Sequence, residues 1–239
     1  MQPTPPQGGP AAPSQSERDR LVYDEIWKRE GDIAPAAGFR QLVELLAAAF
    51  PDGLVADLGC GNGRHAVYAA RHGLRAVGVD HSEEAVRQAT RRAEDLGDRI
   101  EFRQGDAFAW LAAQPDDSLD AIVSFDMLHH RDSSERVAVA ALHDMRRALR
   151  PGGYLLVSLL CDISYSSAER PPGRLFVTAD RGRELLAEAF AGDVGLADGR
   201  EPVFIPGTVS LDPAHGSLVP TDYRATRLWQ LIRTGSSAG

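Results

Sequence analysis

Three glycines at every second position follow an apolar run in the stretch VADLGCGNGRHA, residues 55–66. Gly59, Gly61 and Gly63 weaken any strand or helix that contains them, because glycine has the most backbone freedom to lose on folding. Directly after a buried strand, such glycines allow a sharp turn and let backbone N–H groups approach a ligand closely. The stretch therefore predicts a strand, a tight loop and a helix, with a small charged molecule lying against the loop.

Apolar runs and amphipathic segments alternate after this point. We expect five strands, at 54–59, 75–80, 100–106, 119–125 and 154–160, and helices between them at 63–73, 82–97, 107–114 and 133–150. Strands that alternate with helices form a parallel, doubly wound sheet with right-handed crossovers. Ligands of such sheets bind beyond the carboxyl ends of the strands. The site is therefore expected at 57–63, 80–82, 105–107 and 124–130.

The flanking segments have other patterns. Residues 1–15 are rich in Pro, Gly, Ser and Gln, which is typical of a disordered leader. Residues 16–50 predict two helices, and 16–239 are expected to form one domain with its core at 54–160. Residues 161–239 are expected to hold a substrate-side lid and the final strands. We expect 224–234 to be an edge strand, and 204–222 to contain a strand or a hairpin.

Charge and cysteine content limit the classes of function. The chain of 239 residues has a formal net charge of −8, which argues against electrostatic binding to nucleic acid or to an anionic membrane. No apolar stretch reaches the length of a membrane span. The two cysteines, Cys60 and Cys161, suggest neither a disulfide framework nor a metal site. A cytoplasmic protein is expected.

Acidic residues close three of the expected strands. Asp57 precedes the glycines, where it would repel a pyrophosphate but suits a ligand with a cationic amine. The glycine spacing is GxGxG, and Arg64 stands where a dinucleotide fingerprint has its last glycine. Asp80 can accept hydrogen bonds from two ribose hydroxyls. Asp106 can accept from an exocyclic amine.

These motifs together resemble the class I S-adenosylmethionine-dependent methyltransferases, in particular those that act on small molecules. VADLGCGNG, VGVD, QGDA, LDAIVSF and LRPGGYLLVS resemble the five successive motifs of that family, over residues 54–160. The resemblance implies an α/β fold: a Rossmann-like, doubly wound, mostly parallel sheet of seven strands with helices on both faces. It implies S-adenosylmethionine as cofactor and S-adenosylhomocysteine as product.

The resemblance also assigns roles to residues. Glycines of the loop approach the methionine and ribose parts, Asp57 supports the ammonium group, and Asp80 holds the ribose hydroxyls. An N-terminal helix covers the cofactor in similar enzymes. The residues expected to bind the cofactor are Tyr23, Trp27, Asp57, Gly59, Cys60, Gly61, Gly63, Asp80, His81, Asp106, Ala107, Ser124 and Phe125. Two alternatives stay open: Asp57 caps the following helix, and Cys60 only packs.

His129 and His130 are the candidate catalytic residues. They follow the fourth expected strand, where a histidine could take a proton from a substrate hydroxyl or ammonium group. A purely positional role is the alternative. Asp126 is either a helix-start residue or a partner for a substrate amine. No metal ligands are expected.

The expected reaction is methyl transfer to an oxygen or nitrogen of a small molecule, for example a secondary metabolite. Two alternatives stay open: methylation of a peptide or protein amine, and a catalytically silent protein that binds the cofactor and serves as a partner. A nicotinamide-dependent oxidoreductase is disfavoured by Arg64 in the glycine motif. A monomer or a homodimer is expected, with neither nucleic acid nor membrane as partner.

Overall fold

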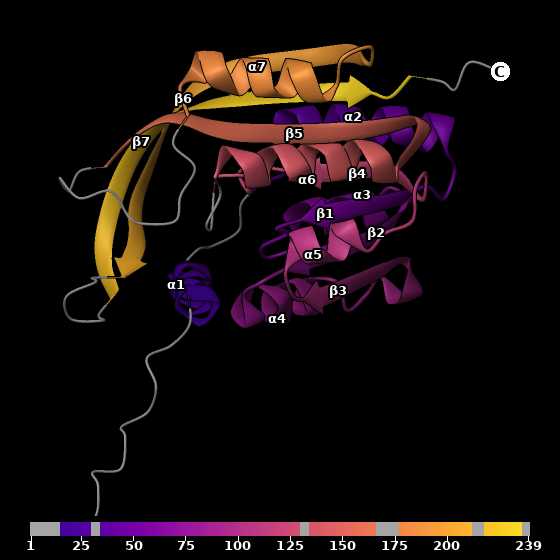
Figure 1. Ribbon diagram of the computed structural model, residues 1–239. Helices are drawn as coiled ribbons and strands as arrows, with labels where there is room; N and C mark the ends of the chain where they lie inside the picture. Colours follow the sequence, from indigo (N-terminus) through magenta and orange to yellow (C-terminus); the bar gives the residue numbers. More distant parts are fainter. Residues whose placement is uncertain (1–14, 30–33, 130–133, 166–176, 212–217, 236–239) are drawn as a thin grey trace, which may run out of the picture.

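The computed structural model describes residues 15–29, 34–129, 134–165, 177–211 and 218–235. In this part of the chain seven strands form one sheet in the order β3-β2-β1-β4-β5-β7-β6. The neighbours from β3 to β5 are parallel, whereas β7 is antiparallel to both β5 and β6. The expected α/β architecture, a mostly parallel seven-stranded sheet with helices, is confirmed (Figure 1).

Apart from the long β5 the parallel strands are short, and apart from the edge strand β3 they are largely buried, as their apolar runs predict. They are β1 (Leu54–Leu58), β2 (Arg75–Asp80), β3 (Ile100–Gln104), β4 (Leu119–Ser124) and β5 (Leu149–Tyr165). Every residue of β4 is buried, whereas most of β3 is exposed because it lies at the edge. The fifth strand is longer at both ends than the expected 154–160.

Helices cover both faces of the sheet. On one face α2 (Ala37–Ala49) and α3 (Arg64–Arg71) form a core with β1 and β4. On the other, α5 (Ala107–Ala112), α6 (Glu135–Ala148) and α7 (Ala179–Ala189) form the larger core. The helix α4 (Glu83–Arg92) begins as the sequence predicts, since Ser82 accepts a hydrogen bond from Ala85 N at 3.1 Å.

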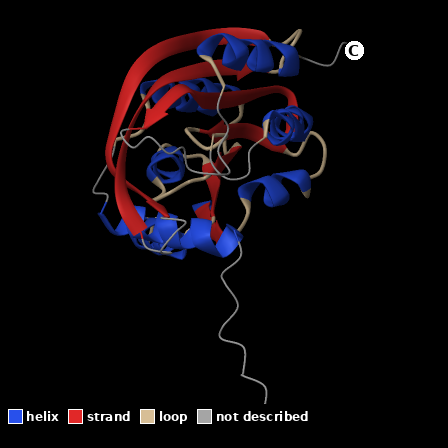
Figure 2. Cartoon of the chain, turned by 60° about the vertical axis from the view of Figure 1, so that its left-hand side comes forward, coloured by secondary structure: helices blue, strands red, loops and turns tan. Residues whose placement is uncertain are grey.

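The C-terminal strands differ from the expectation. Residues 224–234, expected as an edge strand, lie in β7 (Leu218–Arg233), between β5 and β6. The edge strand is β6 (Val194–Leu211). It pairs with β7 as a hairpin, one of the two structures expected at 204–222. The edge prediction is wrong because a further antiparallel strand, without a clear hydrophobic period, pairs along almost the whole of β7. Figure 2 shows these long strands bending around one side of the molecule.

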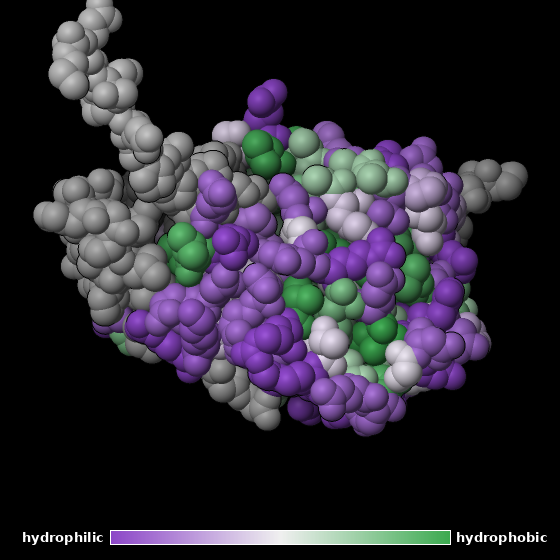
Figure 3. Space-filling view, turned by 90° about the horizontal axis from the view of Figure 1, so that it is seen from below, coloured by the Kyte–Doolittle hydropathy of each residue, from purple (hydrophilic) through white to green (hydrophobic). Residues whose placement is uncertain are grey.

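The hairpin of β6 and β7 reaches the N-terminal helix α1 (Gln15–Arg29), which lies beyond the carboxyl ends of the parallel strands (Figure 1). The same helix is tied to the start of α4, because Asp24 Oδ1 accepts from Ser82 Oγ at 2.6 Å and from Glu84 N at 3.2 Å. On the face shown in Figure 3 the described residues are mostly hydrophilic, with separate hydrophobic patches between them. Among the described residues, no helix has the length and apolar character needed to cross a membrane. The expected leader lies outside the described residues, except for Gln15, which begins α1.

Candidate functional site

A cavity of about 370 Å³ lies at the carboxyl ends of the parallel strands. Its walls come from α1, the glycine loop, the ends of β2 and β4, the start of α5, and the β6–β7 hairpin. The lining residues are Tyr23, Ile26, Trp27, Gly59, Cys60, Gly61, Arg64, His65, Asp80, His81, Asp106, Ala107, Phe108, Phe125, Asp126, Met127, Ile205, Tyr223 and Arg227. Most of these side chains are aromatic or apolar, with charged side chains among them.

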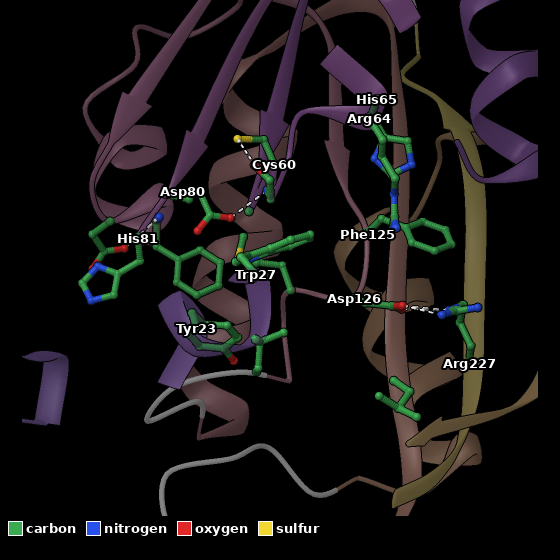
Figure 4. Close-up of a pocket in the computed structure, with 18 of the residues that line it drawn as sticks. Tyr23, Trp27, Cys60, Arg64, His65, Asp80, His81, Phe125, Asp126 and Arg227 are labelled. Atoms are coloured by element: carbon green, nitrogen blue, oxygen red, sulfur yellow. Dashed lines mark hydrogen bonds and ion pairs between the residues drawn. The ribbon is translucent and has the colours of Figure 1, made fainter. Parts of the chain in front are cut away.

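The cavity has two ends. Figure 4 shows Asp80 and His81 on one side, Phe125, Asp126 and Arg227 on the other, and Trp27 between the two groups. The first end belongs to β2 and the second to β4 and β7. In the sheet β1 lies between β2 and β4, and β5 lies between β4 and β7. A ligand that reaches both ends must therefore be extended across the strand termini.

The glycine loop presents bare backbone to the cavity. Gly61 has a φ of +53°, which L side chains rarely adopt, and a Cβ atom there would lie 2.2 Å from Trp27 Cζ2. Gly63 serves packing instead, because a Cβ atom at that position would lie 2.7 Å from Phe102 Cζ on β3. The two glycines thus have different roles: Gly61 lets Trp27 of α1 approach the loop closely, and Gly63 lets α3 and α4 close on the sheet.

Asp80 ends β2 and is fixed from both sides. Its Oδ2 accepts from Gly61 N at 2.8 Å, and its Oδ1 accepts from Ser82 N at 2.9 Å. Burial raises the pKa of this carboxyl, although the two backbone N–H groups act in the opposite direction. A carboxylate has about four acceptor positions, so two backbone bonds leave capacity for further donors. Asp80 therefore presents a preorganised acceptor to the cavity.

Asp57 takes part in the helix start rather than in the described cavity wall. It is only 1% exposed, and its Oδ2 accepts from Ala66 N in the first turn of α3 at 3.2 Å. Its Oδ1 lies 3.7 Å from Nδ1 of His65. Nε2 of the same ring accepts from Ala36 N at 3.3 Å, which places the ring proton on Nδ1, facing Asp57. These contacts favour the capping interpretation of Asp57.

Asp106 caps the next helix. Its Oδ1 accepts from Phe108 N at 3.0 Å and from Ala109 N at 3.3 Å, so the residue begins α5. The same residue and Ala107 line the cavity. The loop after β3 is thereby held in one conformation beside the end of β2.

Asp126 and Arg227 form a forked ion pair at the second end of the cavity. Arg227 Nε donates to both carboxylate oxygens of Asp126, at 2.9 and 3.0 Å, and Nη2 donates to Oδ2. Ser158 Oγ donates to Asp126 Oδ1 at 2.9 Å and accepts from Asp126 N at 2.7 Å. Asp126 has a φ of +57°, a conformation that aspartate tolerates better than most residues. Desolvation acts to lower the pKa of the arginine, but its carboxylate partners outweigh it and raise that pKa.

A family model described as a methyltransferase domain matches residues 55–153. These residues include the glycine loop, Asp80, Asp106 and the end of β4. This segment is a class I S-adenosylmethionine-dependent methyltransferase domain. The resemblance read from the five motifs is confirmed.

Relatives of the methyltransferase domain differ in what they act on. The tRNA (carboxymethyluridine(34)-5-O)-methyltransferase ALKBH8 of Macaca fascicularis is 38% identical over 146 residues, 60% of this chain and 20% of that protein. The ubiquinone biosynthesis O-methyltransferase of Idiomarina loihiensis is 29% identical over 161 residues, 62% of this chain and 64% of that protein. The chain thus spans less than two thirds of either relative.

Solved structures share the fold of the methyltransferase domain. The 1,6-didemethyltoxoflavin-N1-methyltransferase of Burkholderia thailandensis, solved with its substrate and S-adenosylhomocysteine, has a TM-score of 0.56 at 21% sequence identity. The match covers 97% of this chain and 94% of that one, so the N-terminal helices and the C-terminal strands are included.

Most residues expected to bind the cofactor lie around the one cavity described above. Those that line it are Tyr23, Trp27, Gly59, Cys60, Gly61, Asp80, His81, Asp106, Ala107 and Phe125. Among the described residues Asp57, Gly63 and Ser124 lie behind the lining. Cys60 is 4% exposed, its Sγ contacts the Gly61 carbonyl, and burial raises the pKa of its thiol well above the usual range, which favours packing over reactivity.

The two candidate catalytic histidines are placed differently. His129 is fully buried in the turn after β4 and is not among the described lining residues. His130 lies outside the described residues. A proton-accepting role for either residue stays a prediction. The described residues also hold no cluster of three or more His, Cys, Asp or Glu side chains suited to a metal ion.

Sequence reasoning missed the lining residues that come from distant elements. Ile205, Tyr223 and Arg227 belong to β6 and β7, for which no family motif was found. The one available signal was Arg227 itself, a charge within the largely apolar run RLWQLI. Its partner Asp126 was noted without a defined role, because a pairing over 101 positions has no local signature.

Proposed function

We propose that this chain transfers a methyl group from S-adenosylmethionine to an oxygen or nitrogen atom of a small molecule and releases S-adenosylhomocysteine. The observation that carries the proposal is Asp80: a buried carboxylate ends β2, faces the cavity and is aligned by Gly61 N and Ser82 N. A carboxylate at this strand end suits the paired hydroxyls of a ribose.

The residues present fit a nucleoside cofactor. Gly61 leaves room beside the loop for the indole of Trp27, since even a methyl group on Gly61 would overlap that ring. Asp106 and Ala107 lie next to β2 at the end of β3, where an adenine would follow the ribose. Tyr23 and Trp27 of α1 provide aromatic surface above the same end of the cavity. The cavity also falls in the size range of small-molecule sites.

S-adenosylmethionine, when bound, supplies a methyl group activated by the positive charge on sulfur. The chain's own contribution is then to bind, orient and exclude water. Asp80 accepts from the ribose hydroxyls, and the aromatic side chains of α1 shield the cavity from solvent. Asp24, by bonding Ser82 and Glu84, keeps α1 in place over the strand ends.

A general base is needed only where the acceptor must lose a proton before or during transfer. His129 and His130, which both follow β4, are the candidates for that task, and the full burial of His129 favours a positional role for that residue. Positioning carries the larger share of the rate in this proposal, because the methyl group needs no covalent help from the protein.

We further propose that residues 16–239 act as one domain in the cytoplasm, as a monomer or homodimer. The cavity is lined by residues from α1 to β7, which supports one functional unit. Cys60 and Cys161 are both free and buried, which is compatible with a reducing compartment.

A tRNA or peptide acceptor is the alternative to a small molecule. Similarity to ALKBH8 brings tRNA into consideration, but a net charge of −8 opposes binding to a polyanion. The same charge would tolerate a cationic peptide. The aromatic and apolar lining favours a small acceptor over both.

Calorimetry with S-adenosylhomocysteine and with NAD tests the cofactor first. We expect saturable binding of the former alone, and binding of NAD alone would overturn the proposal. Transfer of a labelled methyl group is then followed in separate reactions with pooled small aromatic compounds, basic peptides and tRNA. Label in the small compounds is the expected result. Label only in peptide or tRNA would overturn the acceptor class, and binding without any transfer would favour a silent cofactor-binding protein.

A further inference from the structure

The second end of the cavity is far enough from Asp80 to hold a separate molecule. Asp80 ends β2 and Arg227 lies in β7, so β1, β4 and β5 stand between their strands. Asp126 follows β4, two inter-strand steps of about 4.8 Å from β2, and the Arg227 guanidinium contacts it, so the two ends lie about 10 Å apart across the sheet. If Asp80 holds the cofactor, as proposed above, the Asp126–Arg227 end is left for the acceptor.

Arg227 is held by several partners but keeps unused donors. Its guanidinium carries five N–H groups. Bonds to described residues use three of them: Nε and one Nη2 hydrogen go to Asp126, and one Nη1 hydrogen goes to Glu201 Oε1 at 2.7 Å. One hydrogen on each Nη atom remains for a ligand. Arg227 thus lines the cavity with two N–H donors that no described residue accepts from.

Asp126, by contrast, has little accepting capacity left. Its Oδ1 receives bonds from Ser158 Oγ and Arg227 Nε, and its Oδ2 receives bonds from Nε and Nη2 of the same arginine. These four contacts match the acceptor positions of a carboxylate. Asp126 is therefore a positioning residue for Arg227, and the arginine is the group that meets the acceptor.

The charges around Arg227 decide which ligand it suits. Arg227 is paired with two carboxylates, Asp126 and Glu201, so this group of three side chains has a net charge of −1. Arg64 is the other arginine of the lining, and in the described part of the chain it forms no ion pair with these three residues. An acceptor that brought a carboxylate or phosphate would add a third negative charge beside a cation that is already neutralised. A neutral carbonyl or hydroxyl oxygen takes the free N–H groups without that repulsion.

The walls next to Arg227 favour a flat ring. The guanidinium carbon lies 5.0 Å from the ring centroid of Phe125, and Met127, Ile205 and Tyr223 complete this end of the cavity. Aromatic and apolar walls stabilise a planar apolar molecule by burying its surface, and they offer little to stabilise a charge on it. This end of the cavity therefore suits an aromatic ring.

We propose that Arg227, positioned by Asp126, Ser158 and Glu201, binds a neutral oxygen on an aromatic acceptor and selects against acceptors with an anionic group at that place. This inference rests on the proposed function. It goes further by naming the chemical class of the acceptor and the residue that selects it.

Two probes that differ in one group test the selection. Protein saturated with S-adenosylhomocysteine is titrated at about pH 6 with 3,4-dihydroxybenzaldehyde, which is then neutral, and with 3,4-dihydroxybenzoate, which shares the ring but is an anion. We expect the aldehyde to bind about three- to tenfold more tightly, a ratio set by partly screened repulsion. Equal or tighter binding of the benzoate, or binding of neither probe, would overturn the inference while the proposed function stands. Failure to bind S-adenosylhomocysteine would instead remove the proposed function, and this inference with it.

Variants locate the source of the selection. Glu201→Gln removes one negative charge from a half-exposed side chain, so the preference for the aldehyde is expected to shrink by at least half. Glu188→Gln, on the exposed face of α7, is the matched control and is expected to keep the wild-type ratio. An unchanged ratio in Glu201→Gln would contradict the charge argument.

The arginine itself is tested with a paired variant. Arg227→Gln alone leaves the Asp126 charge without its partner, which can impair folding. The double variant Asp126→Asn, Arg227→Gln avoids that charge and is expected to fold, to bind S-adenosylhomocysteine within twofold of wild type, and to lose the aldehyde preference. A double variant that keeps the preference would show that Arg227 does not select the acceptor.

Discussion

The indole of Trp27 lies against the backbone of Gly61, so closely that a Cβ atom on Gly61 would come within 2.2 Å of Cζ2 and 2.3 Å of Cη2. The two residues are 34 positions apart and are brought together because α1 is tied to α4. Gln88 Nε2 donates to the Trp27 carbonyl at 2.7 Å, beside the bonds of Asp24. The contact joins α1, which lies over the cavity, to the glycine loop. Replacing either Trp27 or Gly61 should therefore change both the stability of the protein and its affinity for the cofactor.

Gly61→Ala is expected to lower the free energy of unfolding by about 1–3 kcal/mol. The residue would keep a left-handed φ of +53°, which costs an alanine about 1–2 kcal/mol, and the indole would have to move. Urea denaturation measures the change. Gly195→Ala is the control, since a Cβ atom on Gly195 meets nothing within 4 Å. Gly61→Ala with the stability of wild type would contradict the close contact.

Asp80→Asn is expected to weaken binding of S-adenosylhomocysteine by about 1–3 kcal/mol, the range for losing hydrogen bonds to a charged group. An amide has only one acceptor oxygen, and its NH₂ group faces the same backbone donors that now bind the carboxylate. Calorimetry measures the change. Asp98→Asn, at an exposed position before β3, should bind as wild type does. Unchanged affinity in Asp80→Asn would remove the role proposed for this residue.

The raised pKa of the Asp80 carboxyl should also appear in the pH dependence of stability. Burial raises the pKa of its carboxyl in the folded state, so the folded chain binds more protons than the unfolded chain above about pH 4. Stability from this group is therefore lost as the pH rises from the unfolded pKa through the folded one. Relative to wild type, Asp80→Asn should become steadily more stable over that window. Urea denaturation from pH 4 to pH 7 measures the difference, and a difference that stays flat with pH would show that burial does not shift this group.

Local patterns were sufficient for the parallel half of the fold. The runs at 54–58 and 119–124 are strands because continuous apolar residues are buried on both faces of a parallel sheet. Ser82 and Asp106 begin helices because their side chains accept from backbone N–H groups two or three residues later. Signals of this kind lie within a few residues of the element they specify.

The antiparallel half of the sheet is fixed by pairing between strands that lie far apart in the sequence. Local patterns did not predict it correctly. Residues 194–211 alternate weakly and contain Gly199 and Pro202, so nothing local predicts an edge strand that extends the sheet. The cavity shows the same limit. Asp80 was found from its place at a strand end, whereas Arg227 becomes a site residue only through the register of β7 against β5 and β6.

His129 is expected to act mainly through structure. Its side chain is fully buried in the turn after β4, and the part of the chain that the structure describes does not place it on the cavity wall. His129→Gln should lower the free energy of unfolding by about 1–3 kcal/mol, as replacement of a buried polar group does. Affinity for S-adenosylhomocysteine should stay within twofold of wild type. A variant with wild-type stability but without methyl transfer would restore the catalytic role predicted for this residue.

The ion pair between Asp126 and Arg227 should contribute measurably to stability. Both side chains are less than a fifth exposed, the guanidinium is forked onto the carboxylate, and Ser158 supports the same oxygen. Exposed pairs contribute at most about 1 kcal/mol, whereas breaking a fully buried pair costs about 3–5 kcal/mol, so this mostly buried pair should lie between these limits. A double-mutant cycle of Asp126→Asn and Arg227→Gln, followed by urea denaturation, is expected to give a coupling energy of about 1–3 kcal/mol. Asparagine also tolerates the φ of +57° at position 126, so the cycle reports the interaction and not backbone strain.

The control is the ion pair between Arg99 and Asp52, which lies at exposed positions and should couple by less than about 1 kcal/mol. Equal coupling energies in the two cycles would mean that the Asp126–Arg227 pair is as solvated as a surface pair. The cavity wall would then lack the fixed arginine described above.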